Sequence, residues 1–252
     1  MTASDEHVRT ERARDEHVRY TGGMTPGSTY NRRERPAKPA LTREAVVAAA
    51  VAVMRAEGVE RVTMRRLAKE LDTGAASLYV YVKDTEELHA AVLDELLAEV
   101  GPDGEGDWRE RLWAVLDSYR AVLFAHPSLA RVALVTRLSG PHYLALVEAV
   151  LALLDEGGMA PGQAAWAVDV LLLTATATAV EHGTRREKPG AAREHEEMTE
   201  SLAGVSPRTH PHIAALGTDL VSGPGPARSR WAFDALLNGA LATPRPAPEE
   251  NR

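Results

Sequence analysis

The architecture of the chain follows from residues 41–83, LTREAVVAAAVAVMRAEGVERVTMRRLAKELDTGAASLYVYVK. Apolar residues recur there at i, i+3, i+4 and i+7, which predicts a short helix with one apolar face: Met64, Leu67, Ala68 and Leu71. In the tight turn that follows, Gly74 can adopt a positive φ and Thr73 can cap the next helix. A second short helix is expected over about residues 75–82. Two short helices joined by such a turn predict a helix-turn-helix, a motif that binds DNA.

A further helix comes before this motif. Thr42 is its expected N-cap, and Gly58 marks its expected end. Thr63 is expected to cap the first helix of the motif. The apolar stripe of the leading helix consists of Val46, Ala49, Ala50, Val53 and Met54. Because three small helices bury little apolar surface, we expect this head, residues 41–85, to pack on the chain that follows.

The head contains, in order, a glycine after its first helix, a threonine, a Leu-Ala pair, a turn, and a Leu-Tyr pair followed by a basic residue. These are Gly58, Thr63, Leu67–Ala68, Asp72–Gly74, Leu78–Tyr79 and Lys83. They resemble the signature of the tetracycline-repressor (TetR) family of bacterial regulators, and the run SLYVYVK resembles the tetracycline-repressor branch itself. The resemblance is strong over the head and looser to about Ala242. It implies a homodimer that binds a palindromic operator and releases it when a small molecule fills the C-terminal domain.

The composition is that of a soluble chain with room for a head and a larger core. Of 252 residues, 44% are hydrophobic, and no continuous apolar run of membrane length is expected. The N-terminus is charged and polar, so no secretory signal is predicted. The absence of cysteine excludes disulfides, thiol redox sensing and cysteine metal sites. We therefore expect a cytoplasmic protein.

The net charge of −7 is unevenly distributed. Residues 30–83 contain 11 Lys and Arg against 6 Asp and Glu, a balance of +5, whereas residues 84–252 have a balance of −11. A basic head on an acidic body favours a polyanionic partner such as DNA. The alternative is a random fluctuation of charge along the chain.

The N-terminal segment shows few core residues. The pentapeptide DEHVR occurs at residues 5–9 and again at 15–19, and glycines, Pro26 and Ser28 follow. Disorder is expected here. The Arg-rich residues 30–40 form an arm that can lie in the minor groove, where arginine gains from the negative potential. The alternative is a solvated linker.

Beyond Lys83 the periodicity predicts an all-α body without strands. Helices are expected over about residues 85–100, 107–126, from Pro127, from Pro141 to Gly157, and over 161–183, 191–203, 208–221 and 228–242, with Thr85 and Asp107 as N-caps. The expected division is a disordered tail with the arm (1–40), a helix-turn-helix DNA-binding domain (41–85), a helical effector-binding and dimerisation domain (86–242) and a disordered tail (243–252).

Two of these helices are expected to form a homodimer interface. The 161–183 helix is apolar on most of its circumference and has small residues from Thr174 to Ala179, and the 228–242 helix offers Trp231 and Leu236. In the family, the corresponding pair packs against its symmetry mate as a four-helix bundle. A two-fold operator needs two heads roughly 34 Å apart. The alternative is that both helices are central to the core of one protomer.

The resemblance also implies DNA contacts. Arg65 lies where the tetracycline repressor uses an arginine on guanine, and the Arg–guanine pair is the commonest specific contact. The Thr63 hydroxyl or nearby helix N-terminal amides suit a phosphate. The expected contacting residues are Thr63, Met64, Arg65, Ala75, Ala76, Ser77, Tyr79, Tyr81 and Lys83. The family's usual lysine two residues after Lys83 is Thr85 here, so one phosphate contact is weakened or moved to Lys83.

A ligand cavity is expected among the helices between residues 85 and 183, lined by apolar and a few polar side chains. Its candidate residues are Trp108, Trp113, Tyr119, Phe124, His142, Tyr143, Trp166, Asp169 and His182. Each of them could instead belong to the core or to the surface. The effector is expected to be a small molecule of unassigned identity.

No metal and no cofactor are expected. The tetracycline repressor holds its drug through magnesium, with a histidine and a glutamate. Glu181 falls near the glutamate position, but Ala133 occupies the histidine position, which argues against a tetracycline–magnesium complex. His195, His210 and His212 lie in a polar stretch and are expected at the solvated surface.

Two other functional classes are the alternatives to this hypothesis. A helical enzyme has no support, because the chain lacks a phosphate-binding glycine loop, a zinc helix motif and a nucleophile elbow. An activator, or a regulator that acts without a ligand, has the same sequence features as a repressor. We therefore expect a ligand-responsive DNA-binding regulator, with repression as the preferred mode.

Overall fold

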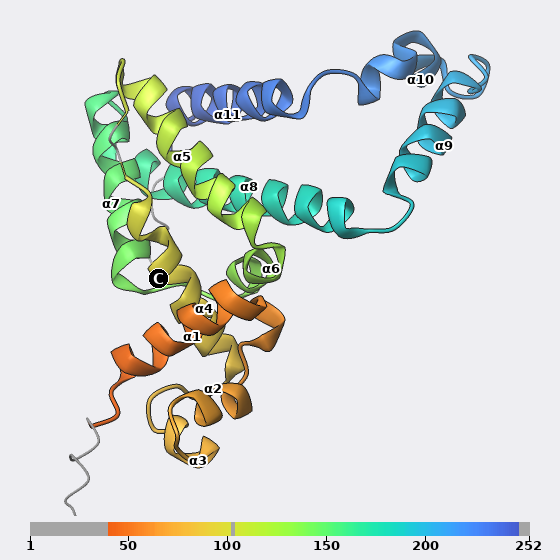
Figure 1. Ribbon diagram of the computed structural model, residues 1–252. Helices are drawn as coiled ribbons and strands as arrows, with labels where there is room; N and C mark the ends of the chain where they lie inside the picture. The colour runs from red at the N-terminus through yellow and green to blue at the C-terminus, as the bar shows by residue number, and fades with distance from the viewer. Residues whose placement is uncertain (1–39, 102–103, 247–252) are drawn as a thin grey trace, which may run out of the picture. The chain divides into compact units, whose positions relative to one another are not determined.

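The computed structural model describes residues 40–101 and 104–246, and all regular structure in these ranges is helical (Figure 1). The all-α prediction is confirmed. The α-helices are α1 (Arg43–Glu57), α2 (Met64–Glu70), α3 (Ala75–Leu78), α4 (Thr85–Leu96), α5 (Trp108–Ala125), α6 (Pro127–Val135), α7 (Pro141–Glu156), α8 (Pro161–Glu187), α9 (Ala191–Ala203), α10 (Pro211–Leu216) and α11 (Gly225–Ala242). Short 3-10 helices are η1 (Val59–Arg61), η2 (Leu97–Glu99) and η3 (Gly217–Val221). The Arg-rich arm lies outside the described residues.

Local capping residues fix the helices of the head, as predicted. The Thr42 side chain accepts a hydrogen bond from the Ala45 amide at 3.1 Å, and the Thr63 side chain accepts one from the Arg66 amide at 3.2 Å. Gly58 ends α1 with a φ of 91°, a conformation that favours glycine. The three helices share one apolar core, which includes Val46, Ala50, Val53, Leu67 and Leu78.

The turn of the helix-turn-helix differs from the prediction. The positive φ belongs to Asp72, at 48°, whereas Gly74 has an extended conformation with a φ of −80°. Aspartate tolerates the left-handed region better than most residues, which explains the exchange. Gly74 is itself the N-cap of α3 and provides no side-chain hydrogen bond, so the expected cap by Thr73 is wrong. Thr73 lies one residue too early for that role.

Two helix ends near α3 also differ from the prediction. Helix α3 ends at Leu78 rather than near Val82, and the chain continues as turns in which the Tyr81 amide donates to the Leu78 carbonyl. The β-branched and aromatic residues that follow Leu78 have lower helix propensity, which accounts for the early end. The cap of α4 is Asp84 rather than Thr85, and its carboxylate accepts from the Glu87 amide at 2.7 Å. A carboxylate gains from the positive end of the helix dipole there.

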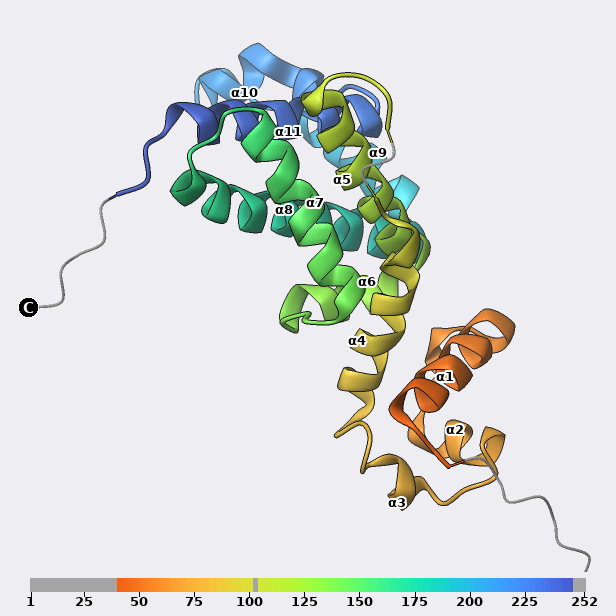
Figure 2. The same ribbon diagram turned by 90° about the vertical axis from the view of Figure 1, so that its left-hand side faces the viewer.

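Helix α8 is the centre of the body, and it packs against α5, α6, α7 and α11 (Figures 1 and 2). It continues past the predicted end at Gly183 to Glu187. Its buried residues are spaced by three or four positions: Ala164, Ala167, Val168, Leu171, Leu172, Ala175, Thr176, Ala179 and Gly183. Most of them are small, which permits close helix packing. A methyl group added at Gly183 would come within 3.0 Å of Cγ of Pro127, at the start of α6.

Helix α8 is also long and apolar enough to cross a membrane by length and composition. The expectation that no stretch of membrane length occurs was therefore too strong. In the structure, 44% of the apolar window is buried against other parts of the protein. A core helix that is packed on several sides meets the same criterion, because neighbours cover faces that would otherwise be polar.

A buried carboxylate connects α4 with α7. Asp94 is 6% exposed, and its two oxygens accept hydrogen bonds from the backbone amides of His142 at 3.3 Å and Tyr143 at 2.8 Å. These amides lie in the first turn of α7, which has no capping side chain of its own. Gly140 makes room for this contact, because an added Cβ would lie 2.1 Å from the Asp94 carboxyl carbon. Asp94 thus caps a helix far along the chain.

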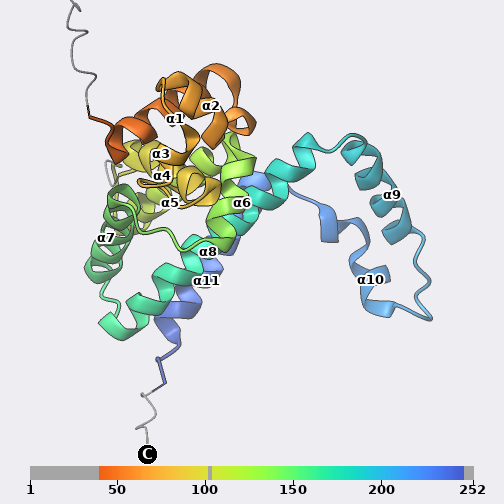
Figure 3. The same cartoon turned by 90° about the horizontal axis from the view of Figure 1, so that it is seen from below.

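Helices α9 and α10, together with η3, form a segment that contributes no buried residue to the core. Both α9 and α10 pack against η3 (Figure 3). The predicted helices over residues 191–203 and 208–221 correspond to α9 and to α10 with η3. Exposed apolar side chains of this segment include Met198, Leu216 and Leu220.

Candidate functional site

The outer surface of the helix-turn-helix combines small, polar and basic side chains. Arg65 projects from the first turn of α2, and Ala76 and Ser77 lie exposed on α3. Tyr79 and Lys83 are exposed beyond α3. The structure therefore brings most of the predicted DNA-contacting residues to the surface of two consecutive short elements. Such a surface can lie against base edges and phosphates of a duplex.

The two arginines at the start of α2 have different surroundings. Arg66 forms ion pairs with Glu57 and, at 2.8 Å, with Glu70. The hydrogen bonds to Glu57 and Glu70 raise the pKa of Arg66, and the same bond from Arg66 lowers the pKa of Glu57. The Arg65 side chain, by contrast, has no hydrogen bond or ion pair to any other described residue. Arg65 is the guanidinium that remains available for a base.

Three predicted contacts are less accessible than expected. Met64 is 5% exposed and belongs to the core, so the prediction that its side chain contacts DNA is wrong. Its position in the apolar i, i+3, i+4 pattern explains this burial. Ala75 and Tyr81 are partly buried and pack against the same core. Thr63 is exposed, and its oxygen already accepts the capping hydrogen bond from Arg66, which leaves its hydroxyl hydrogen for a phosphate.

Val80 was not among the DNA-contacting residues predicted from the sequence. Its side chain is 79% exposed beside Tyr79, which makes it the most exposed large apolar residue of the head. The sequence pattern could have indicated this exposure. Leu78 and Val82 are both buried, and Val80 lies midway between them and points away from the core. An exposed apolar side chain at this place suits contact with a thymine methyl group.

Three of the predicted ligand residues, Tyr119, Tyr143 and Asp169, come from α5, α7 and α8; Tyr119 is buried, Tyr143 is partly buried and Asp169 is exposed. Tyr119 is buried, and its hydroxyl lies 2.8 Å from the Thr176 hydroxyl. Since Thr176 donates its only hydrogen to the Leu172 carbonyl, Tyr119 is the donor of this pair. Burial raises the pKa of Tyr119 to about 12. Burial also raises the pKa of Tyr143, with a further contribution from the charge of Asp169.

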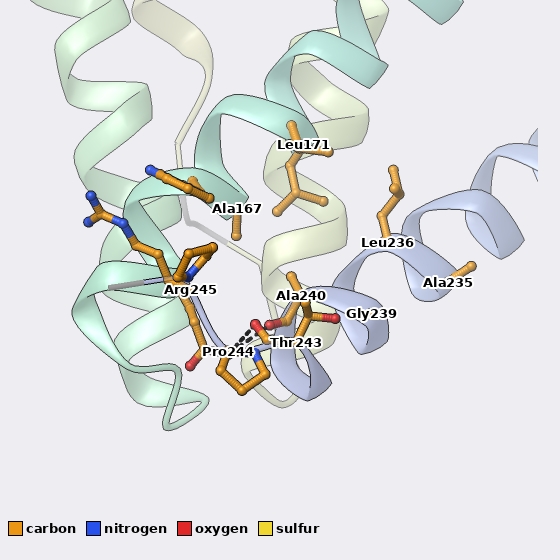
Figure 4. Close-up of a pocket in the computed structure, with 13 residues that line it drawn as sticks. Ala167, Leu171, Ala235, Leu236, Gly239, Ala240, Thr243, Pro244 and Arg245 are labelled. Carbon is orange, nitrogen blue, oxygen red and sulfur yellow. Dashed lines mark hydrogen bonds between the residues drawn. The ribbon is translucent and has the colours of Figure 1, made fainter. Parts of the chain in front are cut away.

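Trp166 lies in a different place, on the outer side of α8. It lines an apolar pocket of about 330 Å³ between the N-terminal half of α8 and the C-terminal half of α11 (Figure 4). In Figure 4, Ala167 and Leu171 of α8 and Leu236 and Ala240 of α11 line this pocket. Gln163 donates to the carbonyl oxygens of Ala240 at 3.0 Å and Thr243 at 2.8 Å, which satisfies the C-terminal end of α11.

A second pocket, of about 510 Å³, lies at the opposite ends of the same two helices, where they approach the C-terminal half of α5. We call it the cationic pocket; it is lined by Asp117, Arg120, Ala121, Phe124, Ala125, His182, Arg186, Gly225, Pro226 and Ser229. His182 and Phe124, both predicted from sequence, meet here. Arg120 and Arg186 were not predicted, because their proximity depends on packing between helices far apart in the chain.

The remaining predicted ligand residues have packing roles. The Trp108 ring occupies the space beside Gly157, where a Cβ would come within 2.7 Å of it. Trp113 makes an edge-to-face contact with Phe233, with ring centroids 5.2 Å apart. His142 donates its backbone amide to Asp94, and no hydrogen bond of its ring to another described residue occurs.

The residues considered for a metal do not assemble into a site. Ala133 packs against the core, and Glu181 pairs with Arg185 at 2.8 Å. Within residues 40–101 and 104–246, no three His, Asp or Glu side chains are grouped closely enough to hold a metal ion. His195, His210 and His212 are exposed.

Two protein families match the chain over adjacent segments. Residues 46–92 match the family of bacterial regulatory proteins of the tetR type, and residues 100–226 match the tetracyclin repressor-like C-terminal domain. The first match covers the helix-turn-helix and most of α4, and the second covers α5 to α10 and both pockets in part. Together they span most of the helical regions described above, and nearly all of α11 lies beyond the second match.

Individual proteins agree with these matches. The transcriptional repressor DrrR1 of Streptomyces coeruleorubidus is 40% identical over 134 residues, which cover 52% of this chain and 50% of that protein. The chain thus spans about half the length of this relative, and 60% of a second curated regulator. The crystal structure of SCO7704 from Streptomyces coelicolor is 56% identical, with a TM-score of 0.72, and covers 84% of this chain and 100% of that one.

A further similar structure is ActR of Streptomyces coelicolor in complex with actinorhodin. It is 32% identical, with a TM-score of 0.68, and the match covers 81% of this chain and 98% of that one. The head geometry, the two family matches and these relatives agree with one another. The chain belongs to the tetR family of bacterial regulatory proteins, with a C-terminal domain like that of the tetracycline repressor.

Proposed function

We propose that this protein is a ligand-responsive repressor that binds a palindromic operator as a homodimer and is released from it by a small molecule. The observation that carries the proposal is the surface of the helix-turn-helix, where Arg65 has no partner among the described residues while Arg66 is held by two glutamates. An unpaired arginine in the first turn of α2 can form two hydrogen bonds with a guanine.

The DNA contacts divide into two groups. Arg65, with apolar contact from Ala76 and Val80, provides sequence preference, because Ala76 has no hydrogen-bonding side chain. Thr63, Ser77, Tyr79 and Lys83 contact phosphates and fix the orientation of the head. Thr85 is the first residue of α4, and Lys83, two residues before it in the sequence, takes over the phosphate contact of the missing family lysine. The Arg-rich arm extends this contact into the minor groove.

The homodimer is supported by large apolar side chains that α8 and α11 leave partly exposed to solvent. Trp166 is 52% exposed, Leu173 is 52% exposed and Trp231 is 74% exposed. Side chains of this size rarely remain in water without a partner when they share one face. Burial of this face against a second copy would form a four-helix bundle and hold two heads on one DNA site. Other residues of α8 and α11 are buried in the core of the protomer. A role in the core and a role in the dimer interface can therefore both hold, on different faces of these helices.

Repression is supported by one relative, and ligand binding by another. DrrR1 is a transcriptional repressor, and ActR has been crystallised with actinorhodin. In this chain, the body after residue 86 contains pockets of a size that holds small molecules. We therefore assign residues 41–85 to DNA binding and residues 86–242 to effector binding and dimerisation, and we place the protein in the cytoplasm, where bacterial DNA lies.

An activator, or a regulator without a ligand, is the second possibility, since DNA-binding geometry is the same in both. An enzyme is the least favoured, because the names of the family and its relatives indicate regulators. These alternatives differ in what a ligand does to operator affinity. By linkage, a ligand that weakens DNA binding must itself bind less tightly to the DNA complex.

The test is selection of bound sequences from a pool of random duplex DNA with the purified full-length protein. Wild type should enrich a two-fold symmetric site. Arg65→Ala should lose about 1–3 kcal/mol of affinity for that site and relax the preference at one base pair per half-site. Arg55→Ala, which removes an exposed arginine of α1, is the matched control and should retain the preference. Equal weakening of Arg65→Ala on every sequence would assign Arg65 to a phosphate and contradict the proposal.

A further inference from the structure

The cationic pocket contains an arginine whose donors are incompletely used. Arg120 is 17% exposed, and it donates to the carboxylate of Asp117 and, at 3.3 Å, to the Ser229 hydroxyl. Its Nε is buried and has no hydrogen-bond partner in the part of the chain that the structure describes. A buried donor without an acceptor is unfavourable, and a guanidinium with one carboxylate partner can bind a second anion.

A second arginine approaches the pocket from α8. The Arg186 guanidinium lies over the Phe124 ring, 5.0 Å from its centroid. His182 lines the pocket one helical turn before Arg186. Asp117 is the one acidic residue among those that line the pocket, against two arginines, so the lining favours a negative charge.

The other lining residues favour a flat apolar group. Phe124, Ala121, Ala125 and Pro226 offer apolar surface beside the two guanidinium groups. Planar guanidinium groups stack on aromatic rings as well as pairing with carboxylates. The volume of about 510 Å³ lies within the range of pockets that hold small organic ligands.

We propose that the cationic pocket binds a small, flat aromatic carboxylate or phenolate, with the anion held by Arg120 and Arg186 and the ring against Phe124. This ligand is the effector of the repressor; its role as effector rests on the proposed function. The interior cluster of Tyr119, Tyr143 and Thr176 is then part of the packed core.

The pocket is connected to the head through α6. Gly183 lies between His182 and Arg186 on α8 and packs directly against Pro127, the first residue of α6. The next residue, Ser128, donates from its hydroxyl to the Glu60 carboxylate at 3.0 Å, and Glu60 belongs to η1 of the head. Helix α6 also packs against α4. A ligand that shifts this end of α8 therefore acts on α6 and, through it, on η1 and α4.

Titration calorimetry of the full-length protein without DNA tests the site. The probes are 2-naphthoate and anthraquinone-2-carboxylate, each compared with its neutral carboxamide. The carboxylates should bind, and the amides should bind about tenfold more weakly, because a charge-assisted hydrogen bond is lost. Failure of both carboxylates to bind, or equal binding of acid and amide, would overturn the ligand class.

Two adjacent arginines of α8 provide a matched pair of variants. Arg186→Gln should weaken carboxylate binding about tenfold, because it removes one of the two cations of the pocket. Arg185→Gln removes an arginine that pairs with Glu181 and does not line the pocket, and it should bind as wild type does. Equal affinities of the two variants would overturn the assignment of the site. Both positions are exposed, so both variants should fold.

Operator binding separates this proposal from the proposed function. Each bound carboxylate should raise the dissociation constant of the selected operator at least about fivefold in a fluorescence anisotropy titration. Ser128→Ala should reduce that effect and leave calorimetric binding without DNA unchanged. Carboxylate binding that depends on Arg186 but leaves operator affinity unaltered would overturn the effector role. Absence of any specific operator would contradict the proposed function, while the calorimetric comparison would still decide the ligand site.

Discussion

The N-terminal ends of α1, α2 and α4 and those of α6, α7, α8 and α11 differ in where they find hydrogen-bond partners. In the head, Thr42, Thr63 and Asp84 cap helices whose amides lie three residues away in sequence. In the body, α6, α7, α8 and α11 begin with proline in the first turn and have no side-chain cap of their own. The cap of α7 is Asp94, 48 residues before His142.

This difference separates what is encoded locally from what depends on the assembled fold. A local cap acts within one turn of chain, so the head can hold its geometry through short-range contacts while it lies on DNA. The body relies on contacts between distant residues, such as the Tyr119–Thr176 pair, which are 57 positions apart. Long-range contacts of this kind allow a ligand at one place to alter packing at another.

The largest expected effect concerns contacts between two copies of the body. Trp166→Asp places a charge in the apolar face of α8, and loss of an interface anchor costs about 2–4 kcal/mol. Because a two-fold dimer contains the substitution twice, the dissociation constant of the dimer should rise by about a thousandfold or more. Sedimentation velocity at micromolar protein measures it. Leu144→Asp, at an equally exposed apolar residue of α7, is the control and should remain dimeric.

A smaller effect is expected within the body, at the long-range cap. Gly140→Ala drives a methyl group into the Asp94 carboxylate and should lower the free energy of unfolding by about 2–4 kcal/mol. Urea denaturation at a fixed protomer concentration measures the change. Gly162→Ala is the control, since its methyl would meet only the flexible side chain of Arg245, at 3.4 Å.

A double variant checks the cause of this loss. Asp94→Ala alone should cost about 1–3 kcal/mol, because two partly buried amides of α7 lose their acceptor. Addition of Gly140→Ala to it should cost little more, since the clash is gone. Additive losses in the double variant would show that Gly140 acts independently of Asp94.

The smallest effect is expected in the head, where each cap serves one helix. Thr63→Ala removes the hydrogen bond to the Arg66 amide and should cost about 1 kcal/mol of stability. Thr63→Ser retains the acceptor and should recover most of it. If Thr63→Ala lowered the free energy of unfolding as much as Gly140→Ala does, local and long-range caps would not differ in their contribution to stability.

The same distinction explains which features could be predicted from sequence. Thr42, Gly58, Thr63 and Asp107 were identified as caps because the pattern that identifies a cap lies within a few residues of it. The helices of the body followed from periodicity and from prolines and glycines at their ends. Errors occurred where two adjacent residues compete for one role, as at Asp84 and Thr85.

The ligand site was predicted less well. Sequence placed His182 and Phe124 among the candidates but not Arg120 and Arg186, which line the same pocket. Arginines on a helix surface are common, and only the packing of α5, α8 and α11 shows that these two face one cavity. Met64 was predicted to contact DNA because its neighbours Thr63 and Arg65 are expected at the DNA surface. Its position on α2 instead places its side chain on the apolar face, in the core.

The proposal of a homodimer on a two-fold operator is tested most directly by the stoichiometry of protein on the selected operator. Fluorescence anisotropy with the labelled duplex held well above its dissociation constant should give two protomers per duplex. A duplex with one half-site scrambled should bind at least a hundredfold more weakly, because both heads contribute to the affinity of a two-fold site. One protomer per duplex, with intact and scrambled sites bound equally, would contradict binding as a homodimer to a two-fold site.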